Sequence, residues 1–278
     1  AAMYDAIAFS GGGNRCYWQG GFYEAASEKL DLKAPLMTAV SAGSFALSYS
    51  LLGIGPRVRE LVITACGPHL RNIDFAGWRA GKPLYPVGAM YLDLLRSVFD
   101  DTALKRLQSI ADIRVAVARL PRGLPPMLGA ALGISAYQIE KKLFHPVHPT
   151  FGRKLGIKQE FVGVRDLRHA PELHDLIVAS GGVPPFMPVT KIGGRPAFDG
   201  GLVDNVPVAP LEPIERAGGK TLVLLTRRYK KIPEIAGRTY VQPSEPIPIS
   251  QFDITNAEGF RRAYELGLKD GKAFASAR

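Results

Sequence analysis

Apolar and polar positions alternate in two regular ways near the start of the chain. Residues 4–10, YDAIAFS, form a short apolar run of the kind that predicts a buried strand. From residue 14 on, apolar residues recur at spacings of three and four, which predicts a helix. Gly20 and Gly21 lie within this helix and each costs about 1 kcal/mol relative to alanine. We therefore expect them to let the helix pack closely against a sheet.

The same strand, turn and helix order then recurs. Residues 35–40, PLMTAV, predict a second buried strand, SAGS a sharp turn, and residues 45–53, FALSYSLLG, a helix that ends at its glycine. Helical patterns fill much of 56–110. Further strands are predicted at 113–120, at 160–167, before the DGG of 199–201 and at 220–226. Helices are predicted at 209–219 and from the TNAE sequence of residues 255–258 onward. In that sequence, Thr255 and Glu258 have the spacing of a capping box.

Alternating strands and helices indicate an α/β fold with a mainly parallel central sheet and helices on both faces. The length of 278 residues favours one domain over residues 1–278. Residues 121–160 are the least regular and are interpreted as an insertion or lid. The basic, proline-rich residues 227–250 are expected to form a surface loop.

Composition restricts the partners and the location. A net charge of +10 favours anionic surfaces, either phospholipid head groups or nucleic acid. Two cysteines, Cys16 and Cys66, are too few for a disulfide framework and lack zinc-site spacing. No apolar run approaches the roughly 18 residues of a membrane span. The start lacks a leader pattern, so we expect a cytoplasmic or peripheral membrane protein, although a leader removed earlier would leave no trace.

The first candidate for chemistry is Ser41. AVSAG, residues 39–43, nearly matches the G-x-S-x-G nucleophile elbow, with Ala39 replacing the first glycine and Gly43 retained. In this motif the serine occupies a strained turn between a strand and a helix. The predicted strand before Ser41 and helix after it supply that context. A structural turn is the alternative interpretation.

A serine nucleophile needs a base. No histidine follows residue 174, whereas an ordinary α/β-hydrolase places its catalytic histidine late in the chain. His174 with Asp166 or Asp112 would form a triad, and an ordinary structural histidine is the competing interpretation. A desolvated carboxylate could serve instead. Asp199 is the candidate, since it follows an apolar strand position and precedes Gly200 and Gly201, which allow a tight turn.

The GGG of residues 11–13 follows the first predicted strand and opens the first helix. Glycines let backbone N–H groups converge on one point, and the helix adds its positive dipole end. Gly11, Gly12 and Gly13 are therefore candidate oxyanion donors for acyl transfer, with Arg15 holding the loop or a lipid phosphate. The spacing fits neither a dinucleotide fingerprint nor a P-loop, because Cys16 stands where a third small residue is needed and no Gly-Lys-Ser/Thr follows.

Together, GGGNR, the near-elbow about thirty residues later and the late DGG resemble the patatin-like phospholipase family. ASGGVPPFMPV, DNVPVAPL and KTLVLLT are similar to segments around that family's DGG motif. The resemblance implies a Ser–Asp dyad without catalytic histidine, with Ser41 as nucleophile, Asp199 as base and the amides of Gly11, Gly12 and Gly13 as oxyanion donors. It covers residues 4–53, 113–120 and 160–227.

The resemblance implies a three-layer α/β fold and a lipid acyl hydrolase of phospholipase A or lysophospholipase type. No metal or organic cofactor is expected. The expected partners are a lipid substrate and an anionic membrane surface. The apolar residues of 121–160 beside Lys141, Lys142, Arg153 and Lys154 are one candidate for the membrane contact, and an ordinary cap or core helix with a solvated charged flank is the favoured alternative. The alternatives are a catalytically silent lipid-binding module of the same fold and an esterase that uses His174. Nucleic-acid binding rests on charge alone and is not expected.

Overall fold

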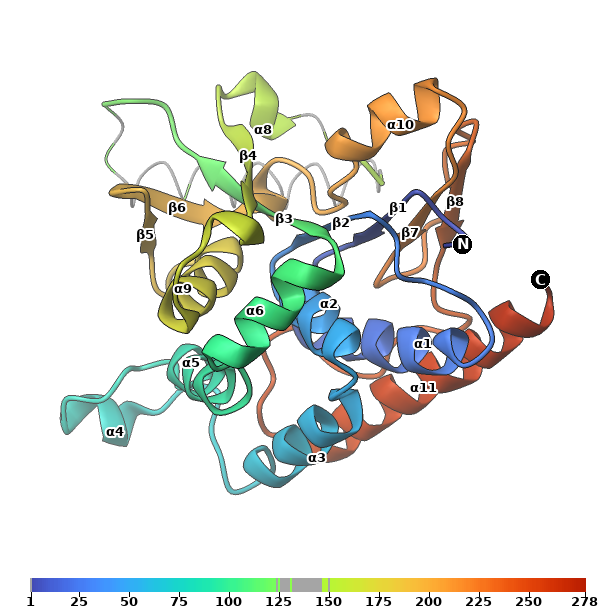
Figure 1. The fold of residues 1–278 in the computed structure, drawn as a ribbon. Coiled ribbons are helices and arrows are strands. Elements are labelled where there is room, and N and C mark those ends of the chain that lie inside the picture. The colour runs from blue at the N-terminus through green and yellow to red at the C-terminus, as the bar shows by residue number, and fades with distance from the viewer. Residues whose placement is uncertain (1, 124, 126–130, 132–146, 150) are drawn as a thin grey trace.

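The computed structural model describes residues 2–123, 125, 131, 147–149 and 151–278. Its centre is an eight-stranded sheet in the order β5-β6-β3-β2-β1-β7-β8, with β4 paired to β3 off this path (Figure 1). The strands are β1 (Ala6–Phe9), β2 (Leu36–Val40), β3 (Asp112–Arg119), β4 (Lys158–Gly163), β5 (Thr190–Ile192), β6 (Arg195–Asp199), β7 (Thr221–Leu224) and β8 (Arg238–Val241).

The helices alternate with these strands along much of the chain. They are α1 (Tyr17–Ser27), α2 (Ala42–Leu52), α3 (Gly55–Ala65), α4 (Phe75–Arg79), α5 (Val87–Val98), α6 (Asp101–Ile110), α8 (Phe151–Lys154), α9 (Ala170–Ser180), α10 (Glu212–Arg216) and α11 (Ala257–Ser276). Four single turns of 3₁₀ helix occupy Gly13–Cys16, Val164–Asp166, Gly200–Leu202 and Ala209–Leu211. The predicted α/β class is confirmed.

Parallel pairing dominates the middle of the sheet. β1 pairs in parallel with β2 and β7, β2 with β3, and β7 with β8, whereas β4 and β6 run antiparallel to β3. The register on β3 brings two strand ends together. Val40, the last residue of β2, lies opposite Ala116, and Asp199, the last residue of β6, lies opposite Val117. The residue after Val40 is therefore next to Asp199, although 158 positions separate Ser41 from it in the sequence.

The two faces of the sheet have different cores. In β1, Ile7 and Phe9 point into the larger apolar cluster, whereas Ala6 and Ala8 belong to a smaller one that includes Leu211. This alternation follows from the two-residue period of a strand. Figure 1 shows the long helices α1, α2, α3 and α11 together below the sheet, with the short helices α8 and α10 above it. The larger apolar side chains of β1 are on the face that the long helices cover.

Glycines bring α1 and α11 into close contact. A Cβ atom at Gly21 would overlap the carbonyl oxygen of Tyr264, and one at Gly267 would overlap that of Trp18. Gly20 faces α2 in the same way. As predicted, these glycines allow close packing of α1. The element that α1 packs on is another helix in each case, however, and not the sheet that was predicted. The spacing of apolar residues along α1 indicates which face of the helix is buried, but it does not indicate whether that face packs on a helix or on a sheet.

Two other expectations need correction. Residues 227–250 contain β8, which pairs in parallel with β7 and is half-buried, so this segment is more than a surface loop. Polar and proline-rich sequence lies on both sides of this short strand, so the pattern of apolar residues did not indicate it. Asn256 caps α11, accepting a hydrogen bond from the Gly259 N–H at 2.8 Å, while the Thr255 hydroxyl donates to Asp253 instead. The predicted capping box is therefore wrong.

Most of the insertion or lid predicted at 121–160 lies outside the described residues, as do Lys141 and Lys142. Within the part that the structure describes, no helix combines the length and apolar character needed to span a bilayer.

The glycine contact between α1 and α11 leads to a stability prediction. Gly267→Ala should lower the free energy of unfolding by about 1–3 kcal/mol, because its methyl group has to displace the backbone of α1. Lys272→Ala on the exposed side of α11 is the matched control and should change stability by about 0.5 kcal/mol or less. Urea unfolding followed by far-UV circular dichroism measures both. Equal stability of the Gly267→Ala variant and the wild type would contradict the packing described here.

Candidate active site

Ser41 occupies a strained turn between β2 and α2. Its φ of 55° and ψ of −138° place it in a region that side chains rarely adopt, and among the described residues it is the only non-glycine residue with positive φ. Such a conformation costs about 1–3 kcal/mol and persists only where the surroundings impose it. A Cβ at Gly43 would overlap the carbonyl oxygen of Ser10, so glycine allows α2 to start against the end of β1.

Two other serines hold the backbone of Ser41 on both sides. The Ser41 N–H donates to Ser180 Oγ at 2.7 Å, and Ser180 Oγ donates to the Ala116 carbonyl of β3 at 2.5 Å. The Ser41 carbonyl accepts from the Ser44 N–H at 3.0 Å and from Ser44 Oγ at 2.6 Å. Both backbone polar groups of the strained residue are therefore satisfied, which offsets part of the cost of its conformation.

The carboxyl group of Asp199 lies beside Ser41. Burial raises its pKa to about 6, against the lowering effect of hydrogen bonds from the Gly201 N–H and the Ser41 side chain. The Gly201 bond is 2.7 Å long. A Cβ at Gly200 would lie 2.7 Å from the Ala116 carbonyl and 2.8 Å from a methyl carbon of Val40, so only glycine fits this turn without displacement. This turn therefore holds the Asp199 carboxyl group beside Ser41.

The glycine loop faces the same point from the end of β1. Gly12 and Gly13 have φ values of 156° and 56°. A Cβ at Gly13 would overlap the Gln251 carbonyl. The Gly11 N–H donates to the Asn205 carbonyl at 3.0 Å, whereas the N–H groups of Gly12 and Gly13 have no hydrogen-bond acceptor among the described residues. Of the three predicted oxyanion donors, Gly11 is therefore already occupied, and Gly12 and Gly13 are available.

Asn205 ties the glycine loop to the turn after Asp199. Its side-chain Nδ2 donates to the Gly11 carbonyl at 2.9 Å, and Thr226 Oγ1 donates to the same oxygen at 2.5 Å. With the bond from the Gly11 N–H to the Asn205 carbonyl, both backbone groups of Gly11 are fixed. This arrangement leaves the next two amides at a defined position relative to Asp199.

The predicted role of Arg15 can be compared with its contacts. Arg15 Nε donates to the Ile249 carbonyl at 3.4 Å, and the Asn14 N–H donates to the Gln251 carbonyl at 2.9 Å. Residues 249–251 are thus attached to the start of the first helix. The role predicted for Arg15, holding the glycine loop or a lipid phosphate, stays a prediction.

Two cavities meet at Ser41. The first is lined by Gly12, Gly13, Ser41, Asp199, Gly201, Asn205 and Phe252. The second has mainly apolar walls: Tyr17, Phe45, Ala46, Tyr49, Val87, Tyr91 and Met187. Ser41 therefore lies between a polar compartment with the candidate base and an apolar compartment whose lining suits a hydrocarbon chain.

The structure does not form the alternative triad through His174. His174 Nε2 hydrogen-bonds the Phe99 carbonyl at 2.8 Å, and the residue is buried within α9. It precedes Ser180 on that helix by six residues, or about 9 Å along the axis. Asp112, one of its proposed acids, pairs with Arg114 instead. Among the described contacts, the imidazole bonds the Phe99 carbonyl and none joins it to Ser41.

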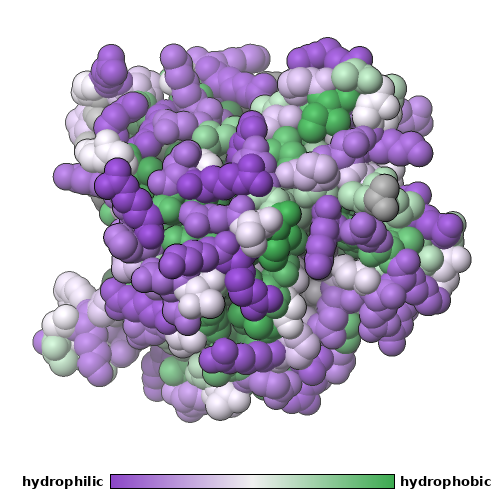
Figure 2. Space-filling model, in the orientation of Figure 1, coloured by the Kyte–Doolittle hydropathy of each residue, from purple (hydrophilic) through white to green (hydrophobic). Residues whose placement is uncertain are grey.

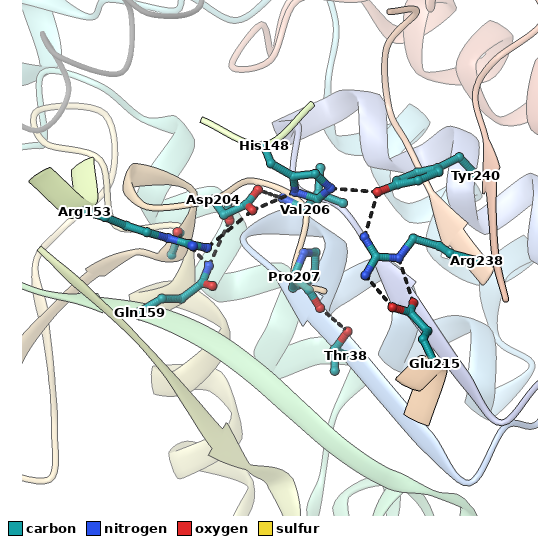
Figure 3. A network of polar contacts seen from close by, with 11 residues as sticks. Thr38, His148, Arg153, Gln159, Asp204, Val206, Pro207, Glu215, Arg238 and Tyr240 are labelled. Atoms are coloured by element: carbon teal, nitrogen blue, oxygen red, sulfur yellow. Dashed lines mark hydrogen bonds and ion pairs between the residues drawn. The ribbon is translucent and has the colours of Figure 1, made fainter. Parts of the chain in front are cut away.

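A polar network supports the turn that carries Asn205 (Figure 3). Asp204 is buried, and its carboxylate contacts His148 Nδ1 at 2.8 Å and accepts from the Val206 N–H at 2.9 Å. His148 Nε2 contacts the Tyr240 hydroxyl at 2.8 Å. Arg238 then joins Tyr240 to a buried ion pair with Glu215. The turn following Asp199 is thereby attached to β8 and α10.

Sequence reasoning missed Ser180, Asn205 and Thr226. Each is a small polar residue whose partner is far away in the chain, so no local spacing marks it. The quoted ASGG and DNVP sequences contain the first two, without indicating what they contact. Among the described ranges, no group of three or more His, Cys, Asp or Glu side chains is arranged to hold a metal ion.

The Asp204 network generates a prediction. Asp204→Ala should lower the free energy of unfolding by about 3 kcal/mol, because it leaves the buried Val206 N–H and the His148 ring without their acceptor. Arg153→Ala is the matched control: its exposed guanidinium approaches the same carboxylate at only 3.8 Å and should contribute about 1 kcal/mol or less. Denaturant titration compares the two variants. Similar small losses in both would show that the network does not support the turn.

This fold and this site can be compared with those of known proteins. A solved structure, VipD from Legionella pneumophila, aligns with a TM-score of 0.48 and 11% identity over 100% of this chain and 67% of its own. No curated protein matches the sequence. The model of the family described as patatin-like phospholipase matches residues 7–212. Because this match spans most of the chain, from the first strand through Ser41 and Asp199, the chain belongs to the patatin-like phospholipase family, and membership implies a lipid acyl hydrolase.

Proposed function

We propose that this chain hydrolyses carboxylic esters of lipids through a Ser41–Asp199 dyad and an acyl-enzyme, as an enzyme of phospholipase A or lysophospholipase type. The observation that supports this most is the pairing of Ser41 with a partly buried carboxyl group whose pKa is about 6. The group is mostly ionised at neutral pH, is a stronger base than an exposed aspartate, and lies beside the two available amides of Gly12 and Gly13.

In the proposed reaction, Ser41 Oγ attacks the acyl carbonyl carbon while the Asp199 carboxylate takes the hydroxyl proton. The carbonyl oxygen becomes an oxyanion, which accepts hydrogen bonds from the N–H groups of Gly12 and Gly13. Collapse breaks the ester bond, and the leaving alkoxide takes the proton from Asp199. Water then attacks the acyl-enzyme, with Asp199 as base, and releases the fatty acid and free Ser41.

The cavities support a lipid as the substrate. The apolar compartment beside Ser41 is lined by residues from α1, α2 and α5, including Tyr17, Phe45 and Tyr91. A further apolar cavity shares Tyr17, Val87 and Tyr91 with it and is also lined by Cys66. An acyl chain could occupy this path with its carbonyl carbon at Ser41. The net charge of +10 favours an anionic lipid surface around it.

A catalytically silent lipid-binding module is the second candidate. It shares the fold and the apolar cavity with the proposed enzyme. It does not explain why Ser41 is held in a strained conformation beside a carboxyl group with a raised pKa, since a binding protein needs neither feature. Reaction of Ser41 with a covalent serine probe distinguishes the two.

The dyad predicts a specific pattern of variants. Ser41→Ala should abolish labelling by a fluorophosphonate probe, and Asp199→Asn should lower kcat on soluble p-nitrophenyl esters at least about 1000-fold, because each removes one of two groups that act as a unit. His174→Ala is the matched control and should retain turnover, since that imidazole bonds the Phe99 carbonyl. An inactive but folded His174→Ala variant would contradict the dyad. A wild type that neither labels nor turns over would favour the silent module.

The pKa of Asp199 predicts the pH dependence. Burial raises this pKa to about 6, so the carboxyl group is protonated and inactive as a base below that value and ionised above it. We expect kcat/KM on a soluble ester to rise with pH and reach half of its plateau near pH 6, rather than near pH 4 as for an ordinary aspartate.

Two histidine variants serve as controls for this assignment. His148→Gln and His174→Ala should leave the midpoint unchanged, because neither imidazole contacts Ser41 among the described interactions. A midpoint that moves in either variant would assign the titration to that histidine instead of Asp199.

A further inference from the structure

Residues 71–86 form a projection that extends from the body of the molecule. Figures 1 and 2 show α4 at the lower left, away from the sheet and its covering helices. Three large apolar side chains on this projection are exposed: Ile73 by 44%, Phe75 by 62% and Trp78 by 59%. Phe75 and Trp78 are three residues apart in α4 and therefore lie on the same side of the helix.

The projection is closed by its own hydrogen bonds. The Asp74 N–H donates to the Leu84 carbonyl at 2.8 Å, which joins the two arms at their base. The Asp74 side chain caps α4 by accepting from the Gly77 N–H at 2.9 Å. The apolar side chains are thus held in the exposed position by a defined backbone. Exposed aromatic residues gathered on one segment are typical of a surface that binds a partner.

Basic residues accompany these apolar side chains. Arg71, Arg79 and Lys82 are exposed on the same segment, and Asp74, which is used as the cap of α4, is the one acidic residue between positions 71 and 86. Aromatic side chains flanked by lysine and arginine suit the interface of an anionic bilayer, where the rings enter the head-group region and the cations contact lipid phosphates.

An aromatic path joins the projection to the active site. Tyr85, in its second arm, packs edge-to-face on Phe186 with ring centroids 4.9 Å apart, and Phe186 stacks on Phe252 at 5.1 Å. Phe252 lines both cavities that meet at Ser41. The projection is therefore linked through packed aromatic rings to the lining of the cavities at Ser41.

We propose that residues 71–86 are the surface by which this protein docks on an anionic phospholipid bilayer, with Phe75 and Trp78 inserted and Arg71, Arg79 and Lys82 at the phosphates. The proposal rests on the proposed function for its lipid substrate. It places the membrane contact at residues 71–86, whereas the sequence offered 121–160 as one candidate.

The sequence provides a built-in probe for this contact. Of the two tryptophans, Trp18 is fully buried and bonded to Asp270, whereas Trp78 is exposed. Vesicles of phosphatidylcholine with phosphatidylglycerol should therefore shift tryptophan emission to the blue, and brominated phosphatidylcholine should quench it. Emission from Trp78 that stays at its aqueous wavelength in vesicle-bound protein would overturn the proposal.

Variants locate the contact. Phe75→Ser/Trp78→Ser should weaken vesicle binding in sedimentation about tenfold or more, because both inserted rings are lost. Arg79→Gln/Lys82→Gln should weaken binding several-fold, and only to the vesicles that contain phosphatidylglycerol. Leu155→Ser/Ile235→Ser, which alters similarly exposed apolar residues elsewhere, is the matched control and should bind as the wild type does. Unchanged binding by Phe75→Ser/Trp78→Ser, or an equal loss in the control, would overturn the proposal.

Two further readouts separate docking from catalysis and from self-association. Ser41→Ala should bind vesicles as the wild type does, and Phe75→Ser/Trp78→Ser should retain turnover of a soluble ester. If the hydrolase proposal fails, the wild type will not turn over the soluble ester, but its vesicle binding will be unaffected. If the wild type were instead a dimer that Phe75→Ser/Trp78→Ser dissociates, the projection would be an interface between copies, and the docking proposal would be overturned.

Discussion

The conformation of Ser41 is the constraint on which the site depends. A non-glycine residue at φ 55° is stable only when its neighbours over-determine it, and here they come from three places. Ser44 holds its carbonyl from the first turn of α2, Ser180 holds its N–H from the end of α9, and Gly43 lets α2 approach β1. The strain is thus distributed over elements that also form the main core.

Strand β3 relates this turn to the candidate base. Ala116 pairs with the last residue of β2 and accepts the Ser180 hydroxyl, while its neighbour Val117 pairs with Asp199. Arg119, also on β3 and buried, donates to the carbonyls of residues 192, 195 and 196, which fixes the hairpin that ends at Asp199. The nucleophile and the carboxyl group are therefore positioned from one strand, and their separation does not depend on a flexible loop.

The sequence predicted the parts of the site that local backbone geometry demands. Ser41, Asp199 and the glycines each need a particular turn, and a turn is encoded by a few consecutive residues. The supporting groups are different: Asn205 bonds Gly11 across 194 positions, and Thr226 bonds the same oxygen across 215. Nothing local distinguishes such a residue from any polar residue in a loop. The α1–α11 contact and β8 were misjudged for the same reason, because both depend on partners far away in the sequence.

The environment of Asp199 balances two opposing requirements of a carboxylate base. Complete exposure would leave its pKa near 4 and make it a weak acceptor of the serine proton, whereas burial without hydrogen bonds would keep it protonated at neutral pH. Burial raises the pKa, and the bonds from Gly201 and Ser41 limit the rise to about 6. In the proposed reaction, this balance leaves Asp199 ionised at neutral pH and still basic enough to take the Ser41 proton.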